Sequence, residues 1–180
     1  MKKHTRNAVI AFALVVFTSM FAIDAMAQQI ECSSPSNKVA AVNNPNGFYI
    51  QKKYQFDKDM QLLLSTTIQA DEGCLIAHLS GQVRITDNYV AFQVRVDGVP
   101  LEGQLPLPLY TKPVVFVAID SSPANDDEQY IDPTKAVAYN LFTKVPRGTH
   151  LVEVLGAAGS GIDPANPPTV THLVLTLEYR

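Results

Sequence analysis

An acidic segment in the second half of the chain holds the residue types best suited to binding a metal ion. Calcium is bound by about six to eight oxygens, many of them from carboxylates and loop carbonyls, and this segment is rich in carboxylates. It lacks the D-x-[DN]-x-[DN]-G spacing of a recognisable calcium loop. The sequence therefore favours a solvated acidic loop, with calcium as the alternative and no other cofactor expected. The candidate ligands are Asp120, Asp126, Asp127, Glu128 and Asp132.

Three histidines lie in segments that we expect to be strands: His78, His150 and His172. Histidine is a common zinc ligand and general base. His150 and His172 fall in the last two predicted strands, which we expect to be neighbours, so these two rings can approach one another. A functional pair also needs a shared face and a third ligand. The sequence favours structural or exposed histidines over a site.

No pattern in the chain predicts a catalytic centre. Gly159-Ser160-Gly161 is not the G-x-S-x-G elbow of a serine hydrolase. No pair of carboxylates has the character of a glycosidase dyad. We therefore predict that the protein is not an enzyme, and keep a small hydrolase as a third hypothesis.

Exposed aromatic rings are the usual means by which a β-sandwich holds a sugar, and the chain has 7 tyrosines but no tryptophan. Tyr110 and Tyr130 fall in predicted loops and are the candidate ligand-binding rings. Most tyrosines in such a chain instead fill the core or the strand edges. A carbohydrate-binding module is therefore an alternative to be tested.

The first 27 residues have the three parts of a secretory signal peptide. Lys2, Lys3 and Arg6 precede an apolar run, and Ala25-Met26-Ala27 is a small-x-small cleavage pattern. Cleavage leaves 11 basic and 16 acidic residues and changes the formal charge from −3 to −5. This acidity disfavours nucleic acid as a partner, because nucleic acid needs a cationic face. We expect a periplasmic or extracellular protein with no transmembrane segment after processing.

The only two cysteines of the chain are Cys32 and Cys74. Exported proteins meet an oxidising compartment, so a structural disulfide is the natural interpretation. A bridge that closes a loop of about 42 residues stabilises a fold by about 4 kcal/mol. We expect it to fasten an extended N-terminal arm, residues 28–47, to the following domain.

Alternating apolar residues dominate the chain from Phe48 onward and predict β-strands. The last run in the chain holds Leu173, Leu175, Leu177 and Tyr179. Val114–Ile119 is apolar throughout, which predicts a central strand buried on both faces. The other alternating runs begin at Phe48, Met60, Leu75, Val90, Val137 and His150.

Turn residues separate these runs, and they include the dipeptide Asp97-Gly98 and most of the 12 prolines. About eight short strands with such connections indicate an all-β fold. We predict an antiparallel β-sandwich of jelly-roll or Greek-key type over residues 48–180.

The final strand, which alternates up to the penultimate residue Tyr179, resembles the last strand of chaperone–usher pilus subunits. The spacing of Cys32 and Cys74 also resembles the disulfide of those subunits. The resemblance covers about the last ten residues and the two cysteines. It implies an immunoglobulin-like fold that is completed by the N-terminal extension of a neighbour, and hence a pilus-like fibre subunit.

Together these features predict an exported, non-catalytic β-sandwich that binds a partner or assembles at the cell envelope. A calcium- or carbohydrate-binding module is the first alternative, and a pilus-like fibre subunit is the second. A protein or a glycan is the expected kind of partner.

Overall fold

Strands make up all the regular structure in the part of the chain that the computed structural model describes, namely residues 36–52, 60–85, 89–104, 114–118, 134–159, 165 and 167–180. These residues belong to one unit, Cys32–Arg180. They form ten strands, and every pairing between them is antiparallel. Within these residues no helix is long and apolar enough to cross a lipid bilayer.

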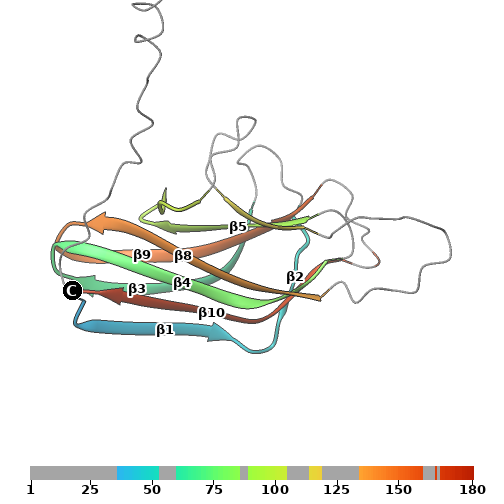
Figure 1. Ribbon diagram of the computed structural model, residues 1–180, viewed down its shortest axis with the longest axis horizontal. Coiled ribbons are helices and arrows are strands. Elements are labelled where there is room, and N and C mark those ends of the chain that lie inside the picture. Colours follow the sequence, from blue (N-terminus) through green and yellow to red (C-terminus); the bar gives the residue numbers. More distant parts are fainter. Residues whose placement is uncertain are drawn as a thin grey trace, which may run out of the picture. The chain divides into compact units, whose positions relative to one another are not determined.

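The strands form two sheets, which we call sheet A and sheet B (Figure 1). Sheet A has the order β1 (Lys38–Asn44), β10 (Thr169–Tyr179), β4 (Gly73–Arg84) and β8 (Thr134–Val145), and β2 (Phe48–Tyr49) also pairs with β10. Sheet B has the order β3 (Gln61–Ala70), β9 (Gly148–Ala158), β5 (Tyr89–Val96) and β6 (Val99–Pro100), and β7 (Val115–Ala118) also pairs with β5.

The pairings are nested along the chain. β1 pairs with β10, β3 with β9, β4 with β8, and β5 with β7, so early strands pair with late ones. The pairs β10–β4 and β9–β5 then join these ribbons into two sheets. This is the winding of a jelly roll, and the predicted antiparallel β-sandwich is confirmed. β1 lies inside the segment 28–47, for which we predicted an extended arm and no strand.

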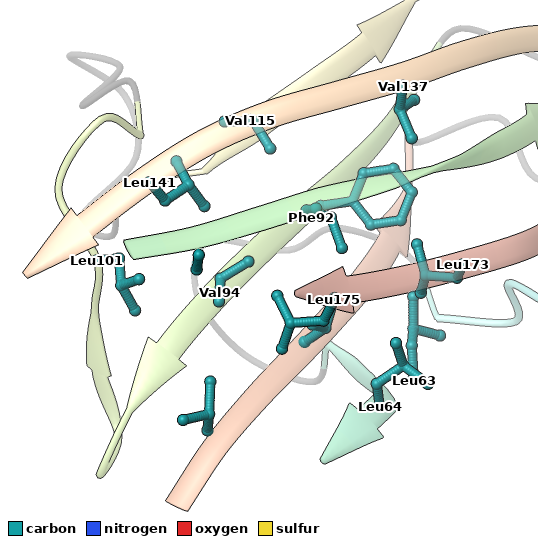
Figure 2. Close-up of a cluster of buried hydrophobic side chains, with 14 of the residues drawn as sticks. Leu63, Leu64, Phe92, Val94, Leu101, Val115, Val137, Leu141, Leu173 and Leu175 are labelled. Carbon is teal, nitrogen blue, oxygen red and sulfur yellow. The ribbon is translucent and has the colours of Figure 1, made fainter. Parts of the chain in front are cut away.

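The core lies between the sheets and is built from the predicted alternating residues (Figure 2). β-Branched and leucine side chains fit a pleated surface that is buried on one face. Phe92 of sheet B and Leu175 of sheet A are both fully buried. The other apolar positions predicted from alternation and found buried are Ile50, Leu64, Ile68, Leu75, Ala77, Leu79, Val83, Val90, Val94, Val96, Val137, Leu141, Val145, Val152, Val154, Leu173 and Leu177.

One predicted face is wrong in β3, where strict alternation would bury Leu62 with Leu64. Leu62 is 50% exposed, whereas Leu63 and Leu64 are both buried. The register against β9 shifts between Leu62 and Leu64, so Leu63 is the extra residue of a β-bulge. Gly156 of β9 makes room for it, because a Cβ there would lie 2.7 Å from Cδ1 of Leu63.

The prediction of a central strand at Val114–Ile119 is also wrong. Among the described residues, β7 pairs only with β5 and so lies at the edge of sheet B. β6 pairs with the other half of the same side of β5, which leaves Val94 between two short partners. The buried side chain of Gln104 fills this gap: its Oε1 accepts from Val94 N–H at 3.0 Å and its Nε2 donates to Val94 O at 2.9 Å. The apolar run agrees with the burial of Val114, Val115 and Val117.

A bend crosses sheet A where three neighbouring strands depart from regular pairing. β1 and β2 follow β10 in one line, interrupted at residues 45–47. At the same level β10 shifts its register against β4 between Thr171 and Val174, and His172 has a φ of 53°. This bulge explains why Val170 and Leu173, which are three residues apart, both face the core. Gly47 has a φ of 74°, and a Cβ there would lie 3.1 Å from Val170 O.

The signal peptide prediction falls on residues outside the described ranges, as does Cys32. Cys74 is buried near the start of β4. The Cys32–Cys74 bridge therefore stays a prediction.

Substitution of Gly47 by alanine should destabilise the fold more than the same substitution at Gly98. Both glycines have a positive φ, which costs a residue with a Cβ about 1–2 kcal/mol. Only at Gly47 would the new Cβ also meet neighbouring atoms, since nothing lies within 4 Å at Gly98. Crowding adds about 1–3 kcal/mol. Urea unfolding followed by circular dichroism measures both variants, and equal losses would contradict the tight contact at the bend.

Candidate functional site

The candidate calcium ligands and the two candidate sugar-binding tyrosines all lie outside the described residues, in segments 119–133 and 105–113. The flanking strands place the ends of the acidic segment: it leaves β7 after Ala118 and enters β8 at Thr134. Within the described ranges no group of three or more histidine, cysteine or acidic side chains could hold a metal ion. The calcium and sugar sites thus stay predictions.

The three histidines lie in strands, as predicted, but they are not brought together. His78 lies in β4, His150 in β9 and His172 in β10. The expectation that His150 and His172 occupy neighbouring strands is wrong, because β9 belongs to sheet B and β10 to sheet A. β8, β9 and β10 alternate between the two sheets, so β9 and β10 are consecutive in the chain but do not pair.

His150 is the centre of the most fully built polar cluster among the described residues. Its side chain is only 5% exposed, and its Nδ1 lies 2.6 Å from Oδ2 of Asp97, in the turn between β5 and β6. Its Nε2 lies 2.8 Å from the carbonyl oxygen of Pro146, in the β8–β9 connection. Carboxylate and carbonyl oxygens only accept hydrogen bonds. Both ring nitrogens must therefore donate, which only the charged imidazolium can do.

The turn conformation and two hydrogen bonds with the backbone of Leu151 hold Asp97 in place, in addition to its contact with His150. Asp97 and Gly98 have φ values of 49° and 82°, as a two-residue type I′ turn requires. Oδ1 of Asp97 accepts from Leu151 N–H at 2.9 Å, and Asp97 N–H donates to Leu151 O at 2.8 Å. We call the unit of Asp97, Pro146 and His150 the histidine clamp. It joins one turn of sheet B to the connection between the two sheets.

The clamp shifts the pKa values of both its ionisable members in opposite directions. The hydrogen bond that His150 donates to Asp97 raises the pKa of His150 above its ordinary value of 6.5, against the opposing effect of burial. The hydrogen bond from His150, with that from Leu151 N–H, lowers the pKa of Asp97 below 3.8. Each partner thus favours the charged form of the other.

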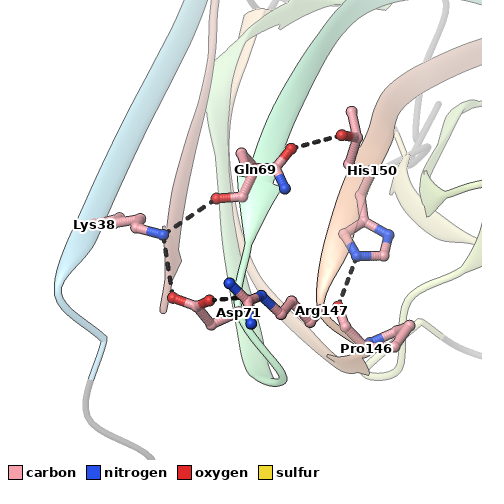
Figure 3. A network of polar contacts seen from close by, with 7 residues as sticks. Lys38, Gln69, Asp71, Pro146, Arg147 and His150 are labelled. Carbon is pink, nitrogen blue, oxygen red and sulfur yellow. Dashed lines mark hydrogen bonds and ion pairs between the residues drawn. The ribbon is translucent and has the colours of Figure 1, made fainter.

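A second polar network lies at the same end of the sandwich (Figure 3). Asp71, after β3, is 3.4 Å from Nζ of Lys38 on β1 and 3.6 Å from Nε of Arg147. Lys38 Nζ also donates to Gln69 O at 3.3 Å, and the Gln69 side chain accepts from Thr149. The network therefore ties β1 of sheet A to β3 and β9 of sheet B. We call this end, with Lys38, Asp71, Asp97, Arg147 and His150, the fastened end.

The remaining histidines lie on exposed surfaces. His78 Nδ1 is 2.8 Å from Asn140 Oδ1 across to β8, and Nε2 is 3.4 Å from Glu178 Oε1 across to β10. This is a row of cross-strand contacts on the outer face of sheet A, and exposed pairs of this kind contribute little to stability. His172 is exposed at the bulge. Neither ring is placed in a cavity.

Several connections begin and end at the opposite end of the sandwich. β4 ends at Arg84, which pairs with Thr134 at the start of β8 and with Thr169 at the start of β10. β5 starts at Tyr89, which pairs with Ala118 at the end of β7. Segments 53–59, 86–88, 119–133 and 160–164 all join strand ends of this region. We call it the connection end, and the acidic segment is one of its connections.

The role of Asp97 was missed by sequence reasoning, which assigned Asp97-Gly98 only a turn. The sequence carried one available signal: a carboxylate at a turn and a histidine at the start of a core-facing run. Gln104 was also missed. A single glutamine gives no pattern, because its role depends on the gap between β6 and β7.

No family model matches the chain, and no curated protein matches it in sequence. A sugar-binding protein, the EclA C-terminal domain, is similar in structure with 12% identity and a TM-score of 0.40, covering 84% of this chain and 86% of that one. The VP2 subviral particle of infectious bursal disease virus has 16% identity and a TM-score of 0.46 over 88% and 37%. A family two carbohydrate esterase from Cellvibrio japonicus has 13% identity and a TM-score of 0.29 over 79% and 34%. With identities and scores this low, these likenesses carry no argument about function.

The free energy of unfolding should fall on both sides of a window from about pH 4 to about pH 6.5. The raised pKa of His150 means that its contribution is complete below 6.5 and is lost as the pH rises through that pKa. The lowered pKa of Asp97 means that its contribution is complete above 3.8 and is lost as the pH falls through it. Urea midpoints measured between pH 3 and 9, at about one-unit steps, test this.

His150→Gln should lose about 1–3 kcal/mol of stability near pH 5.5 and should flatten the decline above pH 6.5. His78→Gln is the matched control, since it removes an exposed histidine and should leave the profile unchanged. An identical pH profile for wild type and His150→Gln would contradict the clamp.

Proposed function

We propose that the protein is an exported, non-catalytic β-sandwich that acts by binding a partner or by assembly at the cell envelope. The observation that carries this proposal is the difference between the two ends of the sandwich. One end is fastened by the histidine clamp and by the Lys38–Asp71–Arg147 network. At the other end, β4, β5, β7, β8 and β10 begin or end, and the acidic segment 119–133 connects two of these strand ends.

A rigid scaffold that presents several connections on one side is a common arrangement for binding, because loops can vary while the sheets hold their bases in place. The histidine clamp supports a structural task for its residues. Both ring nitrogens of His150 are engaged by acceptors, so the ring has no lone pair with which to take a proton from a substrate.

A calcium- or carbohydrate-binding role is the first alternative. It is favoured by the position of the acidic segment, which connects β7 to β8 at the connection end. Carboxylates at the mouth of a sandwich can bind calcium directly or hold a glycan through it. The pilus-like alternative has less support, because β10 is already paired on both sides, by β1 and by β4. A neighbour's strand would have to add at another edge.

Calcium should raise the unfolding temperature if the acidic segment binds it, and the double variant Asp126→Asn/Asp127→Asn should abolish that rise. Glu72→Gln is the matched control, because Glu72 is exposed at the fastened end. A thermal-shift series with calcium, magnesium and chelator, followed by a glycan panel with and without calcium, measures both parts. A calcium response that survives in the double variant would contradict the acidic segment as the site. Absence of any response would eliminate the calcium and carbohydrate alternative.

Export itself is tested by mass spectrometry of the protein recovered from outside the cytoplasm. We expect a chain that begins at Gln28 and is lighter by two hydrogen atoms than the reduced form, because of the Cys32–Cys74 bridge. An intact N-terminus or two free thiols would contradict the proposed export and disulfide.

A further inference from the structure

The buried ring of His150 joins two segments that are far apart in the chain, and Figure 3 shows its contact with one of them. Its Nδ1 lies 2.6 Å from Oδ2 of Asp97, and its Nε2 lies 2.8 Å from the carbonyl oxygen of Pro146. Because both partners only accept hydrogen bonds, these two contacts require two ring protons. The neutral ring carries one proton, so it can serve only one of the two partners.

The proton that remains on a neutral ring belongs on Nδ1. A hydrogen bond to a carboxylate is roughly twice as strong as one between neutral groups. The other tautomer would also direct the lone pair of Nδ1 at the negative charge of Asp97. With the proton on Nδ1, the lone pair of Nε2 instead faces the carbonyl oxygen of Pro146. Loss of one proton therefore changes the contact with Pro146 from attraction to repulsion.

The two partners of the ring differ in how firmly they are held by other contacts. Asp97 keeps its two hydrogen bonds with the backbone of Leu151, at 2.8 and 2.9 Å, whatever the charge of the ring. Pro146 has no N–H, so the carbonyl that faces His150 is its only backbone group for hydrogen bonding. Pro146 and Arg147 are both exposed, so a carbonyl that turns away from the ring meets water.

The side chain of Arg147 adds only a weak second tie to this connection. Its Nε lies 3.6 Å from Oδ1 of Asp71, and the Arg147 side chain is 82% exposed. Exposed ion pairs of this kind contribute little, because water screens them. When the ring loses a proton, we therefore expect the Pro146–Arg147 connection to move and the turn at Asp97 to stay in place.

Asp97 is the charged residue that contacts the ring. The other charged residues on the neighbouring strands and connections are Lys38, Asp71, Glu72, Arg95, Lys144 and Arg147. Within the described residues, no hydrogen bond or ion pair joins any of these six to the ring. Asp71 is engaged by Lys38 and Arg147, and Arg95 pairs with Glu153 of β9 at 2.7 Å. The charge state of the ring thus depends mainly on Asp97.

We propose that the histidine clamp is a pH-sensitive switch, in which loss of the Nε2 proton of His150 releases the Pro146–Arg147 connection while the turn at Asp97 stays bound. The switch is closed when the ring is charged and open when it is neutral. Since Asp97 raises the pKa of His150 above 6.5, the switch opens above that pH. The connection runs from β8 of sheet A to β9 of sheet B, so its release loosens one link between the sheets. This switch does not depend on what the protein binds.

Nuclear magnetic resonance of the folded, isotope-labelled protein between pH 5 and pH 9 tests the switch. The nitrogen shifts of the His150 ring should show that Nε2 loses its proton and that Nδ1 keeps its own. The carbonyl carbon of Pro146 should shift with the same midpoint. The order parameter of the Arg147 amide should fall from about 0.85, typical of rigid backbone, to below about 0.6, whereas that of Gly98 should not change.

His150→Gln should remove the transition at Pro146 and Arg147, because no group that titrates in this range then contacts the connection. His78→Gln is the matched control, since it removes an exposed histidine and should leave the midpoint and the amplitude unchanged. Circular dichroism shows whether both variants are folded.

The wild-type spectra alone can overturn the switch, even if His150→Gln does not fold. A neutral ring with its proton on Nε2 would contradict it, as would a ring that keeps both protons up to pH 9. An Arg147 order parameter that stays constant while the ring titrates would mean that the connection is held by other contacts. Since the measurement uses no ligand, any of these results would leave the proposed binding or assembly role unaffected.

Discussion

The position of β10 between β1 and β4 is the constraint on which the rest of the structure depends. The last strand of the chain lies inside sheet A, so that sheet is incomplete until the whole chain is present. Leu173, Leu175 and Leu177 bring three fully buried side chains to the core from this strand alone. Because the partners of β10 lie early in the chain, the fold relies on pairings of high sequence separation, which are slow to form.

The bend across sheet A follows from the same constraint. β10 must face both β1 and β4, and it changes register against each of them at nearly the same level. His172 accepts a left-handed conformation there, and Gly47 supplies the space that a side chain would occupy. The burial of Val170 and Leu173 on one face offsets the free-energy cost of this local backbone geometry.

Where short strands leave backbone N–H and C=O groups of a neighbour without a strand partner, side chains make the hydrogen bonds instead. Gln104 substitutes for a strand beside Val94, and Asp97 extends the β5–β9 pairing through its carboxylate. His150 then couples that carboxylate to the β8–β9 connection. The described part of the sandwich therefore has one fastened end, and several of its connections begin and end at the other.

The sequence by itself determined the class of fold, because alternation reports which side chains face a core. It correctly predicted the antiparallel sandwich, the turn at Asp97-Gly98 and most core positions. It also placed His78, His150 and His172 in strands. It missed β1, since Lys38–Asn44 is an edge strand in which small and polar residues alternate weakly. It also assigned Leu62 and Leu63 to the wrong faces, because a β-bulge shifts the alternation of inward and outward side chains and no residue type in the sequence indicates it.

Only the tertiary structure decided which strands are neighbours, and this decided the chemistry of the histidines. His150 meets Asp97, 53 residues away, and not His172. That outcome depends on the winding of the chain, which places β8 and β10 in sheet A and β9 between β3 and β5 in sheet B. Periodicity is a property of one strand at a time, whereas register, partners and open edges are properties of pairs, so the pattern of a single sequence carries no record of them.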